Sequence, residues 1–329
     1  MKVTDVGDVH QGDRPPSART ETYTEDINNK LRWIVDFSND EKVDAIIFNG
    51  DIFHIKRADR NSHALVQGVA DILGRSNVPV LIVPGNHDLA EDRLESIASQ
   101  PIGTLALHPN IDLLMGPHPE LPVFGMPYVD TEDVAKIEYW AEKYNEAGPD
   151  NYPLLVAHQS IFPEAEAPIY EYVSAENWAA VFNAPFVAYG HIHSRMKAGA
   201  FYEIGGTWFC NNGAISRGSL HEETVYRELA ITLYDDSEYQ NWNLGPSRRT
   251  SPPNPFTSIP LPHRPAEEVF RLEEVALLED RRAKVDGFLQ SLGGAELTYL
   301  TTEGILEKAR QTDLPHAAVK ELEEIITNV

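Results

Sequence analysis

Five short motifs rich in aspartate, asparagine and histidine lie within the first 193 residues of this 329-residue chain. In chain order they are Asp8-Val9-His10, Gly50-Asp51, Gly85-Asn86-His87-Asp88, His158 and Gly190-His191-Ile192-His193. In extended chain, side chains two residues apart point the same way, so Asp8 with His10 can reach one ion. The same holds for His191 with His193. The pattern therefore indicates a metal site assembled from distant parts of the chain.

Each motif alone supports this interpretation weakly. An isolated histidine such as His158 is more often a core residue, and Gly-Asp after a strand is usually a turn. Gly-Asn-His-Asp and Gly-His-x-His are much rarer. Because all five occur together, each after a short apolar run, the sequence favours a metal site over a purely structural explanation.

The residue types restrict the kind of metal site. The single cysteine, Cys210, excludes both an internal disulfide framework and a cysteine-rich zinc site. The candidate ligands are Asp8, Asp51 and Asn86 through oxygen, and His10, His158, His191 and His193 through nitrogen. This set suits divalent Mn²⁺, Fe²⁺, Co²⁺ or Zn²⁺. It suffices for two ions if one carboxylate bridges them, and two ions about 3.5–4 Å apart can generate hydroxide and promote an in-line displacement.

Short apolar segments must position these motifs. The strand candidates are Lys2–Val6, Ala45–Asn49, Val78–Val83, Leu121–Met126, Leu154–Ala157, Phe186–Tyr189 and Thr207–Cys210. Helical spacing of apolar residues predicts helices at Tyr23–Asn39 and Asp59–Gly74. Alternating strands and helices predict a layered α/β fold, and open α/β sheets bind ligands at the carboxyl ends of their strands.

The charge and the absence of a long apolar run limit the function. The net charge of −24 excludes nucleic-acid binding through global charge, so DNA would need a local basic patch, bound cations or a basic partner. No run approaches the roughly 20 apolar residues of a membrane helix, and the first residues do not resemble a signal peptide. A cytoplasmic protein without membrane association is expected.

The composition changes after Asp236. Residues 245–265 contain seven prolines, which predicts a linker or an extended wrap without regular strand pairing. Residues 266–329 are expected to be helical. The predicted organisation is thus a catalytic domain over 1–244, a linker over 245–265 and a helical module over 266–329. That module is either a cap or partner-docking unit or a plain helical extension of the core.

The order of the motifs resembles the calcineurin-like metallophosphoesterase superfamily over roughly residues 1–240. The resemblance implies a layered β-sandwich flanked by helices. It implies that one ion is held by Asp8, His10, Asp51 and His193, and the other by Asp51, Asn86, His158 and His191. By the same likeness, His87 assists the departing oxygen as a catalytic residue, and Asp88 orients the ring of His87.

Within that superfamily the chain looks like an SbcD-type double-strand-break repair exonuclease subunit in a compact, phage-like form. The matching segments are Gly50-Asp51-Ile52-Phe53-His54, Asp8-Val9-His10-Gln11-Gly12 and the segment 211–217. Gln11 replaces a usual leucine. The likeness implies a Mn²⁺-dependent DNA nuclease that acts with an SbcC-type ATPase and forms a homodimer. It would work in the cytoplasm, that of a host cell if a phage encodes the chain.

Basic residues near the motifs are candidates for substrate binding. The candidates are His54, Lys56, Arg57 and Arg195, with Arg14, Arg19, Arg60 and Lys197 as further cations on the same rim. Such loops often carry lysine and arginine without a function. The alternative enzyme is a phosphodiesterase or phosphatase for a small molecule, a cyclic nucleotide or a phosphoprotein, and a different class is a metal-free scaffold. A basic rim predicts the nuclease, whereas a closed pocket predicts the small substrate.

Overall fold

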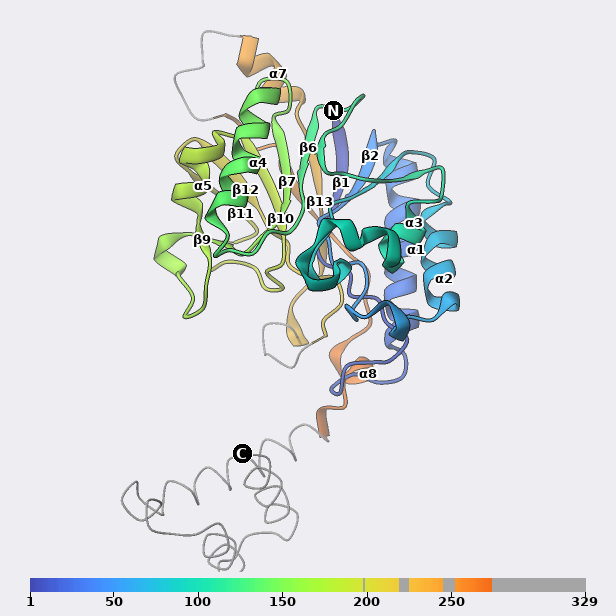
Figure 1. Ribbon diagram of the computed structural model, residues 1–329. Helices are drawn as coiled ribbons and strands as arrows, with labels where there is room; N and C mark the ends of the chain where they lie inside the picture. Colours follow the sequence, from blue (N-terminus) through green and yellow to red (C-terminus); the bar gives the residue numbers. More distant parts are fainter. Residues whose placement is uncertain (198, 219–224, 245–251, 274–329) are drawn as a thin grey trace, which may run out of the picture. The chain divides into compact units, whose positions relative to one another are not determined.

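The computed structural model describes residues 1–197, 199–218, 225–244 and 252–273. Met1–Val269 form one compact unit, and Phe270–Val329 form a second, of which residues 270–273 are described. Two six-stranded sheets make the centre of the first unit (Figure 1). None of the described helices combines the length and apolar character needed to cross a membrane.

The first sheet is built around the N-terminal strand. Its order is β14 (Phe256–Pro260), β13 (Ala230–Asp235), β1 (Lys2–Val6), β2 (Ala45–Phe48), β3 (Val80–Ile82) and β4 (Ile111–Leu113). Strands β1 to β4 are parallel, and β13 runs antiparallel to β1. The carboxyl ends of β1, β2 and β3 therefore meet at one edge.

The second sheet also has four parallel strands, but one antiparallel strand lies at each of its edges. Its order is β11 (Phe201–Ile204), β12 (Thr207–Cys210), β10 (Phe186–Gly190), β7 (Leu154–His158), β6 (Val123–Met126) and β5 (Gly116–Pro117). Strands β12, β10, β7 and β6 are parallel, and β11 and β5 are antiparallel neighbours. A separate pair joins β8 (Ile161–Phe162) to β9 (Val173–Ser174).

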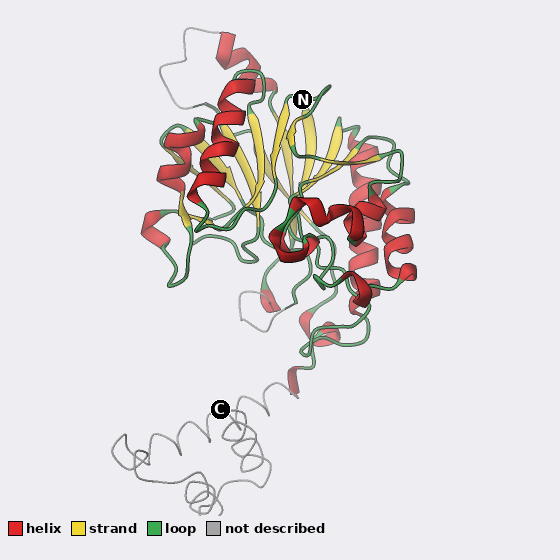
Figure 2. Cartoon of the chain, viewed as in Figure 1, coloured by secondary structure: helices red, strands yellow, loops and turns green. Residues whose placement is uncertain are grey.

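Helices cover the outer face of each sheet (Figure 2). The first sheet packs against α1 (Tyr23–Glu41), α2 (His63–Leu73) and α3 (Pro101–Leu105) in one apolar cluster. The second packs against α4 (Val134–Ala147) and α5 (Ala175–Phe182) in another. Side chains from both sheets form a third cluster between them. Two further helices, α7 (Ser237–Leu244) and α8 (Ala266–Val269), follow β13 and β14 in the chain.

The alternation of the strands explains these layers. In β1, Val3 belongs to the cluster between the sheets, whereas Val6 belongs to the cluster under α1 and α2. In β7, Leu154 faces the first sheet and Leu155 faces the helices. Because successive strand side chains point to opposite faces, a sheet buried on both faces needs apolar residues at almost every position. The continuous apolar runs of the sequence meet that need.

The predicted fold class is confirmed: two layered sheets are flanked by helices. All seven predicted strands and both predicted helices are present, with ends that differ by a few residues. The expectation that proline prevents pairing in 245–265 is wrong for Phe256–Pro260, which pairs with β13. Proline is tolerated there because β14 is an edge strand whose outer side needs no partner.

The boundaries of the predicted domains stay predictions. The compact first unit continues to Val269, past the expected start of the helical module at residue 266. Helix α8 accounts for the first residues of that module. The remainder of the predicted helical module, 274–329, lies outside the described residues.

Candidate metal centre

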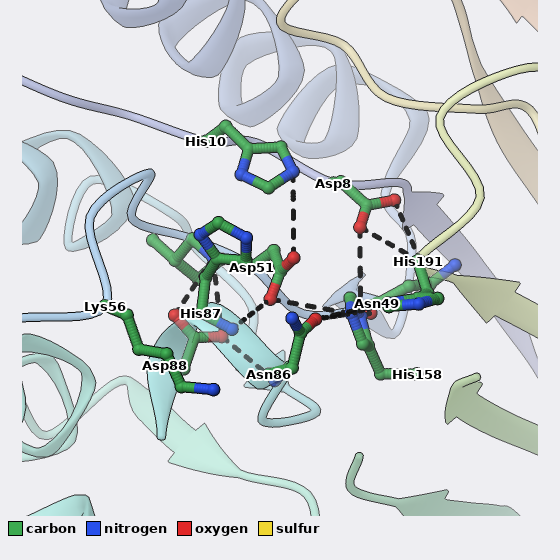
Figure 3. A network of polar contacts seen from close by, with 12 residues as sticks. Asp8, His10, Asn49, Asp51, Lys56, Asn86, His87, Asp88, His158 and His191 are labelled. Carbon is green, nitrogen blue, oxygen red and sulfur yellow. Dashed lines mark hydrogen bonds and ion pairs between the residues drawn. The ribbon is translucent and has the colours of Figure 1, made fainter. Parts of the chain in front are cut away.

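The seven predicted ligand side chains converge at the edge where the parallel strands of both sheets end, and Figure 3 labels all of them except His193. The loops after β1, β2 and β3 carry Asp8 and His10, Asp51, and Asn86. From the second sheet, His158 is the last residue of β7, and His191 and His193 follow β10. Distant positions in the chain thus supply one cluster, as in His10 and His193, whose Nε2 atoms are 2.8 Å apart across 183 residues.

Two sets of ligand atoms in the cluster correspond to the predicted ligands. Asp8, His10, Asp51 and His193 each offer one atom, and these four atoms lie within 4.8 Å of one another. In the second set, Asn86 Oδ1 is 3.1 Å from both His158 Nε2 and His191 Nδ1, which are 3.3 Å apart. Asp51 Oδ1 lies 3.5 Å from His158 Nε2 and Asp51 Oδ2 lies 3.7 Å from His10 Nε2. Asp51 therefore belongs to both sets.

A hydrogen bond on the far side of the His158 ring determines which of its nitrogens faces the cluster. His158 Nδ1 lies 2.5 Å from the Asn49 carbonyl oxygen, so this nitrogen carries the proton and donates. In the neutral ring, which is the form that binds a metal, the lone pair of His158 is then on Nε2, which points toward Asn86 and Asp51. Such a carbonyl partner is the usual way in which a protein fixes the tautomer of a metal-binding histidine. Asn49 was not among the predicted site residues.

Burial and charge favour the forms that bind a cation. Burial lowers the pKa of His191 to about 3, and His158 adds to this effect. Burial also lowers the pKa of His10 well below its usual value, against the opposing charge of Asp51. Both imidazoles are therefore neutral near pH 7, as a metal ligand must be.

His158 and Asp51 form a coupled pair. Burial alone would lower the pKa of His158, but Asp51 and then Asp8 outweigh burial and raise it to about 9. Burial alone would raise the pKa of Asp51, yet His158 and His10 lower it. Without a cation, the proton on His158 balances the buried carboxylate. A divalent ion would take over that role, so its binding releases a proton and tightens as pH rises.

Three of the converging residues hold a strained backbone. His10 has φ 50°, Asp51 has φ 50° and His191 has φ 84°, all in the left-handed region that residues with a Cβ avoid. Such a conformation costs on the order of 1–3 kcal/mol and persists at functional sites where the surroundings enforce it. Here the backbone N–H groups of His10 and His191 donate to Asp51 O and Asp8 Oδ1, at 2.8 and 2.9 Å.

The comparison with known families agrees with this geometry. The sequence model of the family "Calcineurin-like phosphoesterase" matches residues 1–195, which is more than half of the chain. The chain belongs to the calcineurin-like phosphoesterase family. It is therefore a metal-dependent phosphoesterase by family, and the His and Asp cluster at the sheet edge fits the pair of metal ions on which this family depends.

Curated relatives differ in their activities. The chain is 23% identical over 289 residues to the DNA double-strand break repair protein Mre11 of Methanosarcina mazei. The aligned region covers 84% of this chain and 43% of that protein. It is 25% identical over 166 residues to the 3′,5′-cyclic adenosine monophosphate phosphodiesterase CpdA of Haemophilus influenzae, covering 47% of this chain and 56% of that protein. Among solved structures, TT1561 of Thermus thermophilus has a TM-score of 0.45 at 15% identity, covering 70% of this chain and 92% of that one. The chain thus spans less than half of the Mre11 protein that it matches.

His87 belongs to neither of these two ligand sets, but a ring nitrogen of His87 lies within 4.8 Å of ring nitrogens of His10 and His54, a third group that could hold an ion. Its backbone N–H donates to Asp51 Oδ1 at 2.8 Å, and its ring Nδ1 donates to the His54 carbonyl oxygen at 2.6 Å. The ring centroid of His87 is 4.9 Å from that of His10. With Nδ1 engaged, Nε2 is the nitrogen left for a substrate.

The predicted role of Asp88 is wrong in one respect. Asp88 does not orient the His87 ring, because the His54 carbonyl oxygen does so. The Asp88 carboxylate accepts from the backbone N–H groups of Gly85 and Ile52, at 3.0 and 3.1 Å. Adjacent residues in the turn of η2 (Asn86–Asp88) point in different directions, so Asp88 ties the loop after β3 to the loop after β2.

The two hydrogen bonds from backbone N–H groups to the Asp88 carboxylate predict the effect of Asp88→Asn. The amide presents an N–H group to one of the two backbone donors, so we expect the free energy of unfolding to fall by about 1–3 kcal/mol. Chemical denaturation measures this change. Full stability in the variant would show that the two backbone hydrogen bonds do not hold the loop.

The residues predicted to bind substrate differ in their positions and in their ion pairs. His54 reaches the site, with its ring centroid 5.9 Å from that of His87. Lys56 and Arg57 lie in the loop after β2, but each forms an ion pair, Lys56 with Asp92 and Arg57 with Asp59. Arg195 is half-buried and has no ion pair with a described residue.

Arg19 departs from the prediction most clearly. It was expected on the rim, but it is fully buried and pairs with Asp26 at 2.8 Å. Its guanidinium also donates to the carbonyl oxygens of Ser216, Arg217 and Val269. Arg19 therefore anchors the segment after β12 and cannot contact DNA.

Gly50 makes the close approach of Asp51 to His158 possible. Its φ is +103°, and a Cβ at this position would lie 2.3 Å from His158 Nδ1 and 2.9 Å from Gly85 Cα. We expect Gly50→Ala to lower the free energy of unfolding by about 2–5 kcal/mol and to reduce metal content. Thermal unfolding and elemental analysis measure these effects.

A matched control exists in α2. A Cβ on Gly68 would meet nothing within 4 Å, so we expect Gly68→Ala to stabilise the protein by about 0.5–1 kcal/mol. If Gly50→Ala were as harmless as Gly68→Ala, the crowding around His158 would not limit the site.

Proposed function

We propose that this chain is a two-metal phosphodiester hydrolase that acts as a DNA nuclease of SbcD type in DNA repair, recombination or degradation. The observation that carries the hydrolase part is that two sets of ligand atoms share Asp51 at one sheet edge. In this proposal one ion is held by Asp8, His10, Asp51 and His193, and the other by Asp51, Asn86, His158 and His191. Mn²⁺ is the proposed metal because this mixture of oxygen and imidazole ligands suits it, as it also suits Fe²⁺, Co²⁺ and Zn²⁺.

Two bound ions supply Lewis-acid stabilisation and an activated water for in-line displacement at phosphorus. The chain itself supplies proton transfer through His87. Its Nδ1 donates to the His54 carbonyl oxygen, which holds the ring so that a proton on Nε2 can pass to the leaving oxygen. In this proposal the His54 ring, beside His87, contacts the sugar or phosphate next to the scissile bond.

The span of the similarity supports the nuclease over other phosphoesterases. The alignment with the Methanosarcina mazei protein covers 84% of this chain, so it extends beyond the phosphoesterase match at residues 1–195. On this ground we propose DNA as substrate, an SbcC-type ATPase as partner and a second copy of the chain as a dimer partner. The proposed place of action is the cytoplasm, that of a host cell if a phage encodes the chain.

A cyclic nucleotide or other small phosphodiester is the second candidate. The observation that favours it is the pairing of Lys56 and Arg57 with aspartates, which removes two cations from the predicted basic rim. The net charge of −24 acts in the same direction. The similarity to a cyclic nucleotide phosphodiesterase supports this candidate over a shorter part of the chain.

A direct assay separates the two candidates. Linear double-stranded DNA, single-stranded DNA, cyclic AMP and bis(4-nitrophenyl) phosphate are each incubated with the protein and Mn²⁺, with EDTA as the control. The proposal predicts release of nucleotides from DNA that EDTA abolishes. Hydrolysis of cyclic AMP without any cleavage of DNA would replace the first candidate by the second.

A further inference from the structure

A cavity of about 770 Å³ opens beside the metal centre, between the segment after η2 and the start of α4. Tyr128 stands at the boundary: it lines the cavity, and its ring centroid is 5.6 Å from that of His191 and 6.1 Å from that of His158. Trp140 adds a second aromatic side chain to the lining. The volume is within the range of about 300–1,000 Å³ that small-molecule sites occupy.

Part of the cavity lining holds a strained backbone. The consecutive residues Glu91 and Asp92 both have a left-handed conformation, with φ 53° and 54°. Two adjacent residues with a Cβ rarely adopt this conformation, and strain of this kind gathers at ligand sites. The same segment is tied toward the metal centre by the ion pair of Asp92 with Lys56.

The charge of the lining excludes phosphate. Six lining residues are acidic, namely Glu91, Asp92, Glu95, Asp130, Glu132 and Asp133. The two lining cations are engaged, Arg93 with Glu91 at 2.5 Å and Lys136 with Asp133 at 2.8 Å. Within the described part of the chain, no cation lies within ion-pair distance of Glu95, Asp130 or Glu132. Such a lining accepts a cation or an uncharged group that donates hydrogen bonds, and the substrate of the proposed function supplies a group of the second kind.

A nucleobase has these properties. It is flat and uncharged, it stacks on tyrosine, and the exocyclic amine of cytosine donates to carboxylates. Building on the proposed function, we infer that the cavity binds the nucleobase of the nucleotide whose phosphate lies at the metal centre, with Tyr128 as the stacking surface. The carboxylates then select bases that carry an exocyclic amine. Because they also repel a following phosphate, the bound nucleotide is the last of its strand or a mononucleotide.

Three small phosphodiesters test the stacking surface. The 4-nitrophenyl phosphodiesters of deoxycytidine, thymidine and methanol share a leaving group and differ in the base. We expect KM to be lowest for the deoxycytidine ester and highest for the methyl ester. Tyr128→Ala should reduce the ratio of KM for the methyl ester to KM for the deoxycytidine ester about tenfold, whereas Tyr128→Phe should keep it.

The control variant is Tyr139→Ala, which removes an exposed aromatic side chain of α4 that does not line the cavity. The KM ratio should not change in this variant. A Tyr128→Ala variant in which KM rises by the same factor for all three esters would mean that Tyr128 only supports His191, and the base site would be abandoned.

The carboxylates have a test of their own. The double variant Asp130→Asn with Glu132→Gln keeps the shape of the lining and removes two charges. We expect the preference for deoxycytidine over thymidine to fall toward unity in this variant. An unchanged preference would overturn the selection that we assign to the carboxylates.

Direct binding separates this inference from the proposed function. Calorimetry with deoxycytidine monophosphate and Mn²⁺ requires no turnover. If the protein cleaves none of the three esters, the proposed function fails, and this measurement decides the base site by itself. About tenfold weaker binding by Tyr128→Ala supports the site, and equal affinity contradicts it.

Discussion

Replacing Asp51 by Asn is expected to remove both metal ions together and to lower phosphodiester hydrolysis by at least about 10³-fold, equivalent to about 4 kcal/mol. Asp51 is the residue common to the two ligand sets, with Oδ1 3.5 Å from His158 Nε2 and Oδ2 3.7 Å from His10 Nε2. The amide keeps one oxygen but turns the other ligand position into an N–H donor, which repels a cation. Elemental analysis of the purified variant measures the metal content, and hydrolysis of bis(4-nitrophenyl) phosphate measures the activity.

Asp36→Asn is the matched control for this change. Asp36 is exposed on α1 and belongs to neither ligand set, so its metal content and activity should equal those of the wild type. If the Asp51 variant kept one ion at full occupancy while losing the other, Asp51 would be a ligand of a single ion and not a bridge.

Replacing His87 by Ala is expected to leave two ions bound while lowering kcat by about 10²–10⁴-fold. The ring belongs to neither of the two ligand sets assigned above, and its Nδ1 donates a hydrogen bond to the His54 carbonyl oxygen. Its role in the proposal is to supply a proton to the leaving oxygen. The loss should therefore be largest for substrates whose leaving group is a poorly stabilised alkoxide, and smaller for a 4-nitrophenolate leaving group.

His63→Ala provides the control, since His63 is exposed at the start of α2, away from the described ligand sets. Comparing DNA or a dinucleotide with bis(4-nitrophenyl) phosphate measures the dependence on the leaving group. An equal loss for both kinds of leaving group would contradict proton transfer by His87. Loss of metal from the variant would instead make His87 a ligand or a support of one.

The layers, and the convergence of the motifs at one edge, could be predicted from the sequence because both depend on local patterns. Each buried strand is a short apolar run, and each motif follows such a run, so the parallel order of β1, β2, β3, β7 and β10 brings the motifs to one edge. Strand β13 was not predicted, although it pairs with β1. The apolar run in Ala230–Asp235 is less continuous than those of the predicted strands. The position of β13 is determined by its pairing with β1, which lies at the other end of the sequence of the compact unit.

What could not be predicted depends on contacts between distant residues. The pairing of Lys56 with Asp92 joins positions 36 residues apart and removes a cation that the local sequence presents as free. The burial of Arg19 follows from its pairing with Asp26 and from carbonyl groups at residues 216, 217 and 269. Charge in a loop is visible in the sequence, whereas the partner of that charge is not.

The orientation of side chains within a motif also could not be predicted from the sequence. Asp88 follows His87 directly, which suggested that one orients the other, but the turn of η2 directs Asp88 to backbone groups instead. The left-handed backbone of His10, Asp51 and His191 has no signal in residue type, since glycine is absent at all three positions. Tyr128 has no motif around it, and only the cavity beside it points to a role.

Anomalous X-ray diffraction from crystals grown with Mn²⁺ tests the central claim most directly. The account predicts two anomalous peaks about 3.5–4 Å apart, one on each side of the Asp51 carboxylate, with Asp8, His10 and His193 around one and Asn86, His158 and His191 around the other. A single peak, or peaks away from this sheet edge, would contradict it.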